Sequence, residues 1–296
     1  MFQSIARTVA LVAALALGTA TAATAETITV GGKNFTEQLL LAEMTEQLLA
    51  AKGYDVDKRD GLGSTVLRQA QENGQVDVYW EYTGTSLVVY NKVKERLSPE
   101  ETYEKVKELD AEKGLVWLNP SKANNTYALA MNRSEAEEKG IASISDLKAK
   151  LEAGEELSFA VNAEFPHRED GLRGLQKTYD FRYPRSLLKA MESGLTYQAL
   201  KENQVDVGLV FATDGRIAAF DFVTLEDDRG FFPAYAITPV IRKETLDANP
   251  ELADVLNGLS AKLDDDTMRK LNASVDVDKK TIEEVAGSFL SEQGLI

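Results

Sequence analysis

AQENGQVDVYWEY, residues 70–82, is echoed further along the chain by LKENQVDVGLVF, residues 200–211. Each stretch is typical of a helix end, a tight turn and a buried strand, and each ends on an aromatic residue, Tyr82 or Phe211. Ligands of open α/β sheets bind beyond the carboxyl ends of the strands. The echo therefore favours two related α/β lobes that face each other across a ligand cleft. The alternative is that two unrelated helix-turn-strand units have similar sequences.

The residues before Tyr82 predict one α/β lobe. Apolar side chains recur at helical spacing in residues 36–51, with Thr36 as a candidate N-cap and Gly53 after the helix end. The expected elements, in chain order, are a strand at 27–30, a turn at 31–32, a helix at 36–51, a strand at 54–59, a helix at 64–72 and a strand at 76–82. This β-α-β-α-β order indicates a parallel sheet covered by helices.

The middle of the chain repeats this order and predicts a second lobe. The expected elements there are a strand at 157–162, helices at 170–179 and 196–202, and a strand at 205–211. We expect the chain to cross into the second lobe near residues 124–131 and to return near 232–240, which makes a two-stranded hinge. Lobe 1 would then comprise residues 26–127 and 236–296, and lobe 2 residues 128–235.

The N-terminal residues predict export. Arg7 precedes the apolar run Val9–Leu17, and Ala23-Thr24-Ala25 has the small-x-small pattern that signal peptidases cut. We therefore interpret residues 1–25 as a cleavable signal peptide, because the run is far shorter than the roughly 20 residues that span a membrane. The chain has no cysteine, so it forms no disulfide and has no lipid-anchored cysteine after the signal. A periplasmic location fits these features.

The composition argues against several functional classes. The formal net charge is −15, which disfavours nucleic acid and anionic lipid as partners. One histidine, His167, and no cysteine make a transition-metal site improbable, and we expect no cofactor. The chain has no G-x-S-x-G, P-loop or H-E-x-x-H motif. Asp77 and Glu81 share a strand face, but structural carboxylates suit that position better than a catalytic pair.

Four aromatic residues lie at connections that follow strands: Tyr82, Tyr127, Phe211 and Tyr235. Any one of them alone is more often a core residue than a ligand contact. Together they predict an aromatic box, and such boxes hold quaternary ammonium groups by cation–π attraction. A trimethylammonium group cannot donate a hydrogen bond, so aromatic faces are nearly its only polar partners.

A series of short motifs resembles the substrate-binding proteins of glycine betaine/choline/carnitine ABC importers. The resemblance covers essentially the whole mature chain, in order. Its motifs are GKNFTEQ (32–38), YWEYTGT (79–85), NTYA (125–128), REDGL (168–172), TDGR (213–216), LEDD (225–228) and FP (232–233). Together they are specific for the family and less specific for the substrate.

The resemblance implies a bilobal periplasmic-binding-protein fold that closes over its ligand. By motif position, Tyr82, Tyr127 and Tyr235 would form the walls of the box. Phe211 stands where such proteins often have tyrosine, so this chain keeps the ring and lacks the hydroxyl.

The same resemblance implies that Lys33, Thr85 and Arg168 hold the ligand carboxylate. The chemistry agrees, because an arginine fork suits a carboxylate and Lys33 precedes a helix N-terminus, which attracts anions. Gln38 is a further candidate lining residue, and His167 we interpret as an incidental residue at the rim.

The resulting hypothesis is a binding protein without catalysis. It would capture glycine betaine or a related quaternary ammonium zwitterion and deliver it, as a monomer, to a membrane permease with its ATPase. Choline, carnitine, proline betaine and ergothioneine remain alternative ligands for the same fold. An enzyme on a similar bilobal frame is the alternative from a different class.

Overall fold

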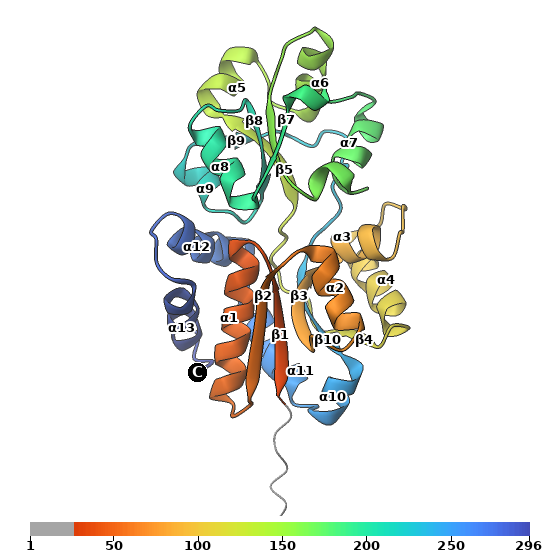
Figure 1. Cartoon of the computed structure of the whole chain (residues 1–296), viewed down its shortest axis with the longest axis vertical. Coiled ribbons are helices and arrows are strands. Elements are labelled where there is room, and N and C mark those ends of the chain that lie inside the picture. Colours follow the sequence, from red (N-terminus) through yellow and green to blue (C-terminus); the bar gives the residue numbers. More distant parts are fainter. Residues whose placement is uncertain (1–26) are drawn as a thin grey trace, which may run out of the picture.

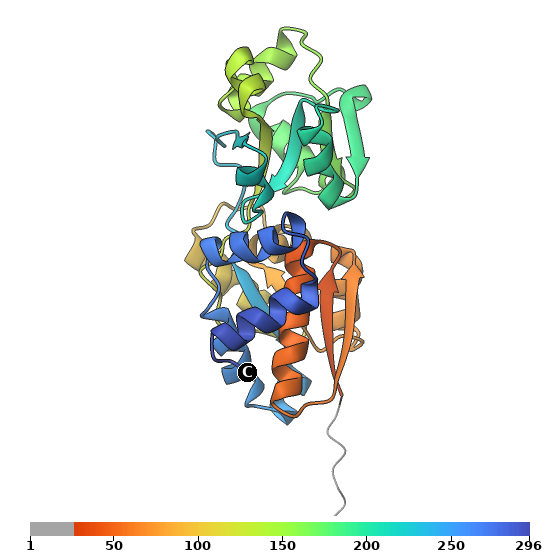
Figure 2. The same ribbon diagram turned by 90° about the vertical axis from the view of Figure 1, so that its left-hand side faces the viewer.

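The computed structural model describes residues 27–296 as two α/β lobes stacked along the long axis of the molecule (Figure 1). The turned view shows the same two lobes joined at a narrow waist (Figure 2). The predicted signal peptide, residues 1–25, lies outside the described residues. Two lobes of the expected α/β type are therefore present, as the fold prediction required.

The sheet of lobe 1 has the strand order β2-β1-β3-β10-β4. Strand β1 pairs in parallel with β2 and β3, whereas β10 is antiparallel to β3 and β4. The strands are β1 (Ile28–Lys33), β2 (Val56–Leu62), β3 (Val78–Tyr82), β4 (Leu115–Trp117) and β10 (Ile237–Arg242). The predicted parallel β-α-β-α-β unit is confirmed, and the returning chain extends it with an antiparallel strand.

Helices cover both faces of this sheet (Figure 1). The helices of lobe 1 are α1 (Thr36–Ala51), α2 (Ser64–Glu72), α3 (Thr83–Thr85), α4 (Pro99–Ala111), α10 (Lys243–Ala248), α11 (Leu252–Ser260), α12 (Asp265–Asp276) and α13 (Ile282–Glu292). A π-helical turn, Ser86–Tyr90, follows α3. The C-terminal helices α12 and α13 lie against α1, so the end of the chain packs on lobe 1.

The sheet of lobe 2 has the strand order β7-β6-β8-β5-β9. Its strands are β5 (Tyr127–Asn132), β6 (Phe159–Asn162), β7 (Leu188–Met191), β8 (Val207–Phe211) and β9 (Phe222–Thr224). Its helices are α5 (Arg133–Lys139), α6 (Ile144–Glu152), α7 (Leu172–Tyr179), α8 (Ser193–Lys201) and α9 (Arg216–Ala219), with 3-10 turns at Phe165–His167 and Arg185–Leu187.

The two sheets have the same topology, with β6 in the place of β1, β7 of β2, β8 of β3, β5 of β10 and β9 of β4. The sequence echo marks this equivalence. Asp77 accepts a hydrogen bond from the backbone N–H of Thr29 at 2.8 Å, and Asp206 accepts one from that of Ser158 at 2.6 Å. Each aspartate thus ties the start of its own strand to the neighbouring parallel strand.

Two local predictions in lobe 1 were wrong. Residues 31 and 32 belong to β1 and do not form a turn. A Cβ on Gly31 would lie 2.5 Å from Cδ1 of Leu67, so glycine lets α2 pack closely on the strand. Thr36 is the first residue of α1 and not its cap, which is Phe35; the Thr36 hydroxyl donates instead to Asp276 on α12.

The two crossings between the lobes run side by side. Asn124 and Ala236 form an isolated antiparallel bridge, and the N–H of Asn125 donates to the carbonyl of Tyr235 at 3.1 Å. Beyond this bridge the outgoing chain enters β5 and the returning chain enters β10. Both crossings therefore hold aromatic residues next to the space between the lobes.

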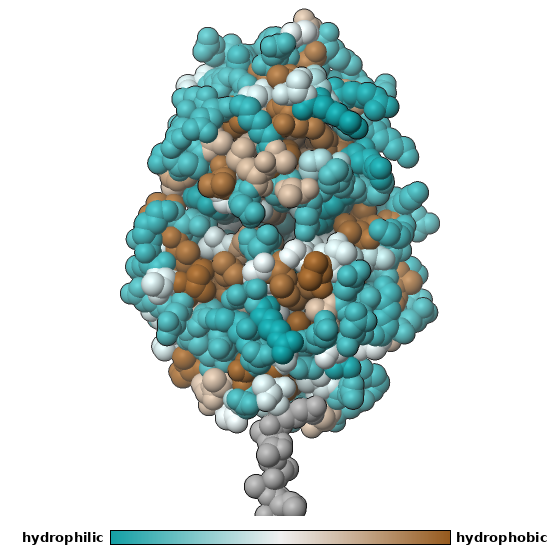
Figure 3. Space-filling view, viewed as in Figure 1, coloured by the Kyte–Doolittle hydropathy of each residue, from teal (hydrophilic) through white to brown (hydrophobic). Residues whose placement is uncertain are grey.

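The surface drawn in Figure 3 is mostly hydrophilic, and apolar side chains gather on it near the waist. No helix within residues 27–296 combines the length and the apolar character needed to cross a membrane.

Candidate ligand-binding site

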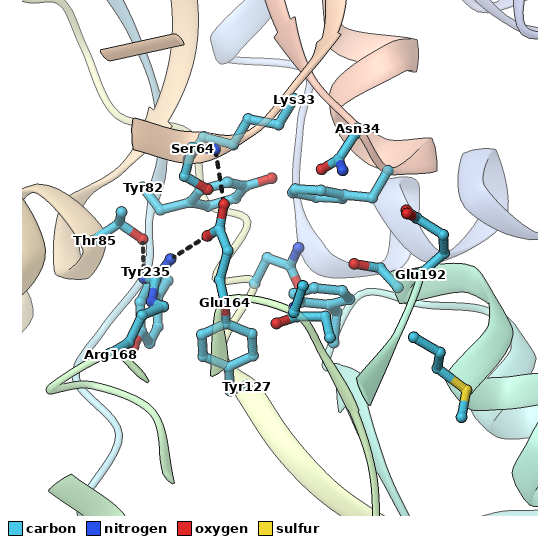
Figure 4. Close-up of a pocket in the computed structure, with 17 residues that line it drawn as sticks. Lys33, Asn34, Ser64, Tyr82, Thr85, Tyr127, Glu164, Arg168, Glu192 and Tyr235 are labelled. Carbon is cyan, nitrogen blue, oxygen red and sulfur yellow. Dashed lines mark hydrogen bonds and ion pairs between the residues drawn. The ribbon is translucent and has the colours of Figure 1, made fainter. Parts of the chain in front are cut away.

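A cavity lies between the lobes and is lined by residues of both (Figure 4). Seven of the eight residues that the sequence singled out line it: Lys33, Tyr82, Thr85, Tyr127, Arg168, Phe211 and Tyr235. The eighth, Gln38, does not. Its side-chain amide is buried and donates to the carbonyl of Trp80 at 2.8 Å and to the hydroxyl of Tyr82 at 3.0 Å, so it supports the wall from behind.

Five aromatic rings converge on the cavity, and we call them the five-ring cluster: Phe35, Tyr82, Tyr127, Phe211 and Tyr235. The centroids of Tyr127 and Phe211 are 5.3 Å apart, and those of Tyr127 and Tyr235 are 5.8 Å apart with the planes at 77°. Tyr82 ends β3 and Phe211 ends β8, so the equivalent strands of the two lobes each contribute one ring. This is the convergence that the position of the rings after strands predicted.

Phe35 is a member of the cluster that the sequence analysis missed. Its ring stacks on Phe211 at 5.1 Å and 11°, and lies 6.2 Å from Tyr82. The residue sits between the end of β1 and the start of α1. The signal was available, because an aromatic residue just after a strand is the same feature that identified Tyr82.

Hydrogen bonds fix the tyrosine rings of the cluster. The Tyr82 hydroxyl donates to Glu37 at 2.9 Å, and the Tyr235 hydroxyl donates to Asp170 at 2.9 Å. Burial raises the pKa of Tyr127 to about 12, so this phenol stays neutral at physiological pH. The rings therefore present fixed, uncharged π-faces.

Glu37 is the anchor behind Tyr82 and reaches elements of both lobes. Besides Tyr82, its buried carboxylate accepts hydrogen bonds from Asn125 at 2.6 Å, from Asn272 at 3.3 Å and from the hydroxyl of Thr213. Asn125 lies on the outgoing crossing and Thr213 in the loop after β8. Burial raises the pKa of Glu37, and these four donors oppose that effect.

Lys33 lies at the cavity wall already paired. Its ammonium donates to Glu81 at 2.6 Å and sits 4.7 Å from the centroid of the Tyr82 ring. Both side chains of the pair are almost fully buried, and burial lowers the pKa of Lys33 despite the attraction of Glu81. Glu81, considered above as half of a carboxylate pair, is thus the counter-ion of this lysine, while Asp77 faces Thr29.

The guanidinium of Arg168, which we expected to be free to bind the ligand carboxylate, is already paired. Its Nε donates to Asp170 at 2.8 Å and its Nη2 to the same carboxylate at 2.6 Å, so a residue of the chain occupies the bidentate face. Nη2 also donates to the Thr85 hydroxyl at 3.1 Å, which joins lobe 2 to lobe 1 (Figure 4). Nη1 is 3.2 Å from Glu164. The guanidinium therefore braces the cavity and offers one edge to it.

Glu164 crosses the cavity from lobe 2 to lobe 1. It follows β6, and its Oε1 accepts a hydrogen bond of 2.9 Å from the backbone N–H of Ser64, the first residue of α2 (Figure 4). Burial acts to raise the pKa of this carboxyl, but the Ser64 bond and the charge of Arg168 outweigh it and lower the pKa. The glutamate is thus charged at neutral pH.

The remaining lining residues are polar or small except for Met191, and the sequence analysis named none of them as ligands: Asn34, Ser64, Asn125, Asn162, Ala163, Glu164, Met191, Glu192 and Ser193. Glu192 lies on the opposite side of the cavity from Thr85 and Arg168 (Figure 4). Asn125 had a signal, since it stands two residues before Tyr127 in a family motif. Glu164 and Glu192 had none, because ordinary surface glutamates have the same local sequence.

Within residues 27–296 there is no group of three or more histidine or acidic side chains placed to hold a metal ion. His167 is exposed, and it is not among the residues that line the cavity. The arrangement is suited to a small molecule that carries a cation for the rings and polar groups for the charged rim.

Comparison with known proteins agrees with this geometry. A family model described as the substrate binding domain of ABC-type glycine betaine transport systems matches residues 26–292. The chain is 46% identical over 280 residues to a glycine-betaine-binding protein of Pseudomonas aeruginosa, covering 93% of this chain and 90% of that one. It is 35% identical over 271 residues to an ergothioneine transport permease/ergothioneine binding protein of Helicobacter pylori, covering 90% of this chain and 48% of that one.

A solved structure of a glycine betaine/carnitine/choline ABC transporter protein superposes with a TM-score of 0.72 at 27% identity, and covers 90% of this chain and 99% of its own. The likeness in fold and the family match extend over both lobes and the cavity between them. The chain belongs to the family of substrate-binding domains of ABC-type glycine betaine transport systems.

Proposed function

We propose that this protein captures glycine betaine, or a related quaternary ammonium zwitterion, and delivers it to an ABC permease. The observation that carries the proposal is the five-ring cluster, which brings rings from both lobes and both crossings to one cavity. The lobes would comprise residues 26–127 with 236–296, and residues 128–235, after removal of residues 1–25 as a signal peptide.

The ring cluster provides a place for the trimethylammonium group. Cation–π attraction is worth about 2 kcal/mol or more for a desolvated cation. Tyr82, Tyr127 and Tyr235 are almost fully buried, so little water competes for their faces. Tyr82 already faces Lys33 and Tyr127 faces Arg168, so the ligand would use the ring faces that these two cations leave free.

The opposite pole of the ligand would face Lys33, Thr85 and Arg168. All three are buried at the cavity wall, and Thr85 and Arg168 already join the lobes. A carboxylate placed there gains charge-assisted hydrogen bonds, which are roughly twice as strong as neutral ones. Since the donors come from both lobes, binding would favour the closed arrangement over an open one.

Delivery rather than catalysis is the role we infer. Binding of the permease to the closed lobes would couple capture to import, with the ATPase of the importer as the energy source. We infer a periplasmic monomer, in line with the predicted signal peptide and the acidic surface. The relatives and the cavity both support a binding role over an enzyme on the same frame.

Choline, carnitine, proline betaine and ergothioneine are the alternative ligands. The similarity to the Helicobacter pylori ergothioneine protein supports ergothioneine, a larger trimethylated amino acid, as one alternative. All five molecules share a quaternary ammonium group; four of them also carry a carboxylate, and choline has a hydroxyl in its place.

Isothermal titration calorimetry of residues 26–296 against these five ligands tests the proposal. We expect saturable binding of at least one of them, with one ligand per chain, and weaker binding in Tyr127→Ala and Tyr235→Ala by about 1–3 kcal/mol. Phenylalanine at the same positions serves as the matched control, since it keeps the ring. Absence of heat with all five ligands, from a folded protein, would refute the proposed function.

A further inference from the structure

Glu164 occupies the place that a ligand carboxylate would take. One of its oxygens accepts from the N–H of Ser64, at the N-terminus of the nine-residue helix α2, and the other is 3.2 Å from Nη1 of Arg168. A helix N-terminus and an arginine are the two kinds of donor that favour an anion here. The chain itself supplies that anion.

The contact made by Glu164 leaves few N–H donors free to bind a ligand carboxylate. A guanidinium has five N–H groups. In Arg168 two of them bind Asp170, one binds Thr85 and one binds Glu164, which leaves a single N–H. A ligand carboxylate therefore gains the Ser64 amide and a second N–H of Arg168 only when Glu164 moves away.

The charges at the cavity point the same way. Lys33 and Arg168 are the cations that line it, and each is already paired with a buried carboxylate, Glu81 and Asp170 respectively. Glu164 and Glu192 line the cavity as well, so carboxylates outnumber cations around the ligand. Such a field attracts a quaternary ammonium group and repels a carboxylate.

Glu164 is the more exposed member of its pair with Arg168. Its side chain is 36% exposed, whereas that of Arg168 is 7% exposed, so the glutamate is the movable partner of the pair. Its partial exposure makes Glu164 the side chain that can turn toward solvent when the contact breaks.

We propose that Glu164 is a specificity-determining residue that competes with the ligand carboxylate for the N-terminus of α2 and for Arg168. It lowers the affinity for zwitterions such as glycine betaine relative to quaternary ammonium alcohols such as choline, which have no carboxylate. This inference rests on the proposed function, because it concerns the ligand pole opposite the five-ring cluster.

The test is a pair of calorimetric titrations, glycine betaine and choline, on wild type, Glu164→Gln and Glu164→Ala. We expect both variants to bind glycine betaine more tightly relative to choline by at least about ten-fold, the order expected for regained charge-assisted hydrogen bonds. Glu192→Gln is the matched control. It removes the same charge from the cavity and leaves the α2 N-terminus occupied, so any shift of the betaine-to-choline ratio that it causes measures the effect of net charge and should be smaller than the shift in Glu164→Gln.

Three results would overturn the inference. An unchanged ratio in both Glu164 variants excludes competition. A similar loss of affinity for both ligands shows that Glu164 serves only to hold the lobes together. An equal shift of the ratio in Glu192→Gln assigns the effect to net charge alone. If wild type binds neither of these ligands nor carnitine, proline betaine or ergothioneine, the proposed function fails as well; if wild type binds glycine betaine and the ratio does not move, only the role of Glu164 fails.

Discussion

Replacing Arg168 by methionine separates its structural role from its role toward the ligand. The change removes the two bonds to Asp170, the bond to Thr85 and the contact with Glu164. The Asp170 side chain is fully buried and would keep only the hydroxyl of Tyr235 as a partner. Breaking a buried ion pair in this way costs about 3–5 kcal/mol, so Arg168→Met should lower the free energy of unfolding by that amount.

The double variant Arg168→Met/Asp170→Asn removes the uncompensated charge. An asparagine oxygen can still accept from Tyr235, so we expect chemical denaturation to show most of the lost stability restored. Glycine betaine binding should remain weaker than in wild type by about 2–5 kcal/mol, because the ligand carboxylate still lacks its guanidinium. Choline binding should change far less.

The assay is therefore a denaturation curve and two calorimetric titrations on the same three proteins. Equal losses for betaine and choline in the double variant would assign Arg168 to bracing alone. A double variant that regains both stability and wild-type betaine affinity would refute any contact between Arg168 and the ligand.

Three further predictions concern other parts of the molecule. Phe35→Ala should weaken betaine binding by about 1–2 kcal/mol in calorimetry, whereas Phe35→Tyr should retain it. Equal affinities of wild type and Phe35→Ala would show that the Phe35 ring does not contribute to ligand binding. Gly84→Ala should lower the melting temperature, because its Cβ would lie 2.7 Å from the carbonyl oxygen of Ala234; an unchanged melting temperature would contradict this. Burial acts to raise the pKa of Asp110, but Arg68 outweighs burial and lowers the pKa, so the free energy of unfolding should fall as the pH drops below about 4. Urea denaturation at pH 5 and pH 3 should show a smaller fall in Asp110→Asn than in wild type.

The regular elements were predictable because their signals are local. Helices α1 and α2 begin and end at the predicted residues, whereas the place of the antiparallel β10 between β3 and β4 was not predicted. Strand β3 starts at Val78, two residues later than expected, because Asp77 before it turns to the backbone of Thr29.

The aromatic part of the site was also predictable, since strand ends meet at the cleft in this topology. The polar part was not. The contact between Glu164 and Ser64 joins residues 100 positions apart in different lobes, and it depends on how the lobes close. The sequence predicts that Gln38 lines the cavity, yet its side-chain amide donates to the carbonyl of Trp80, a buried acceptor.

The central claim is that the five-ring cluster holds a cation, and a carbon isostere tests it most directly. 3,3-Dimethylbutanoate has the shape and the carboxylate of glycine betaine, but a neutral carbon replaces the ammonium nitrogen. We predict that calorimetry will show it to bind at least about 2 kcal/mol more weakly than glycine betaine, the contribution of a desolvated cation–π contact. Equal affinities for the two molecules would contradict the account, because shape and apolar burial would then suffice.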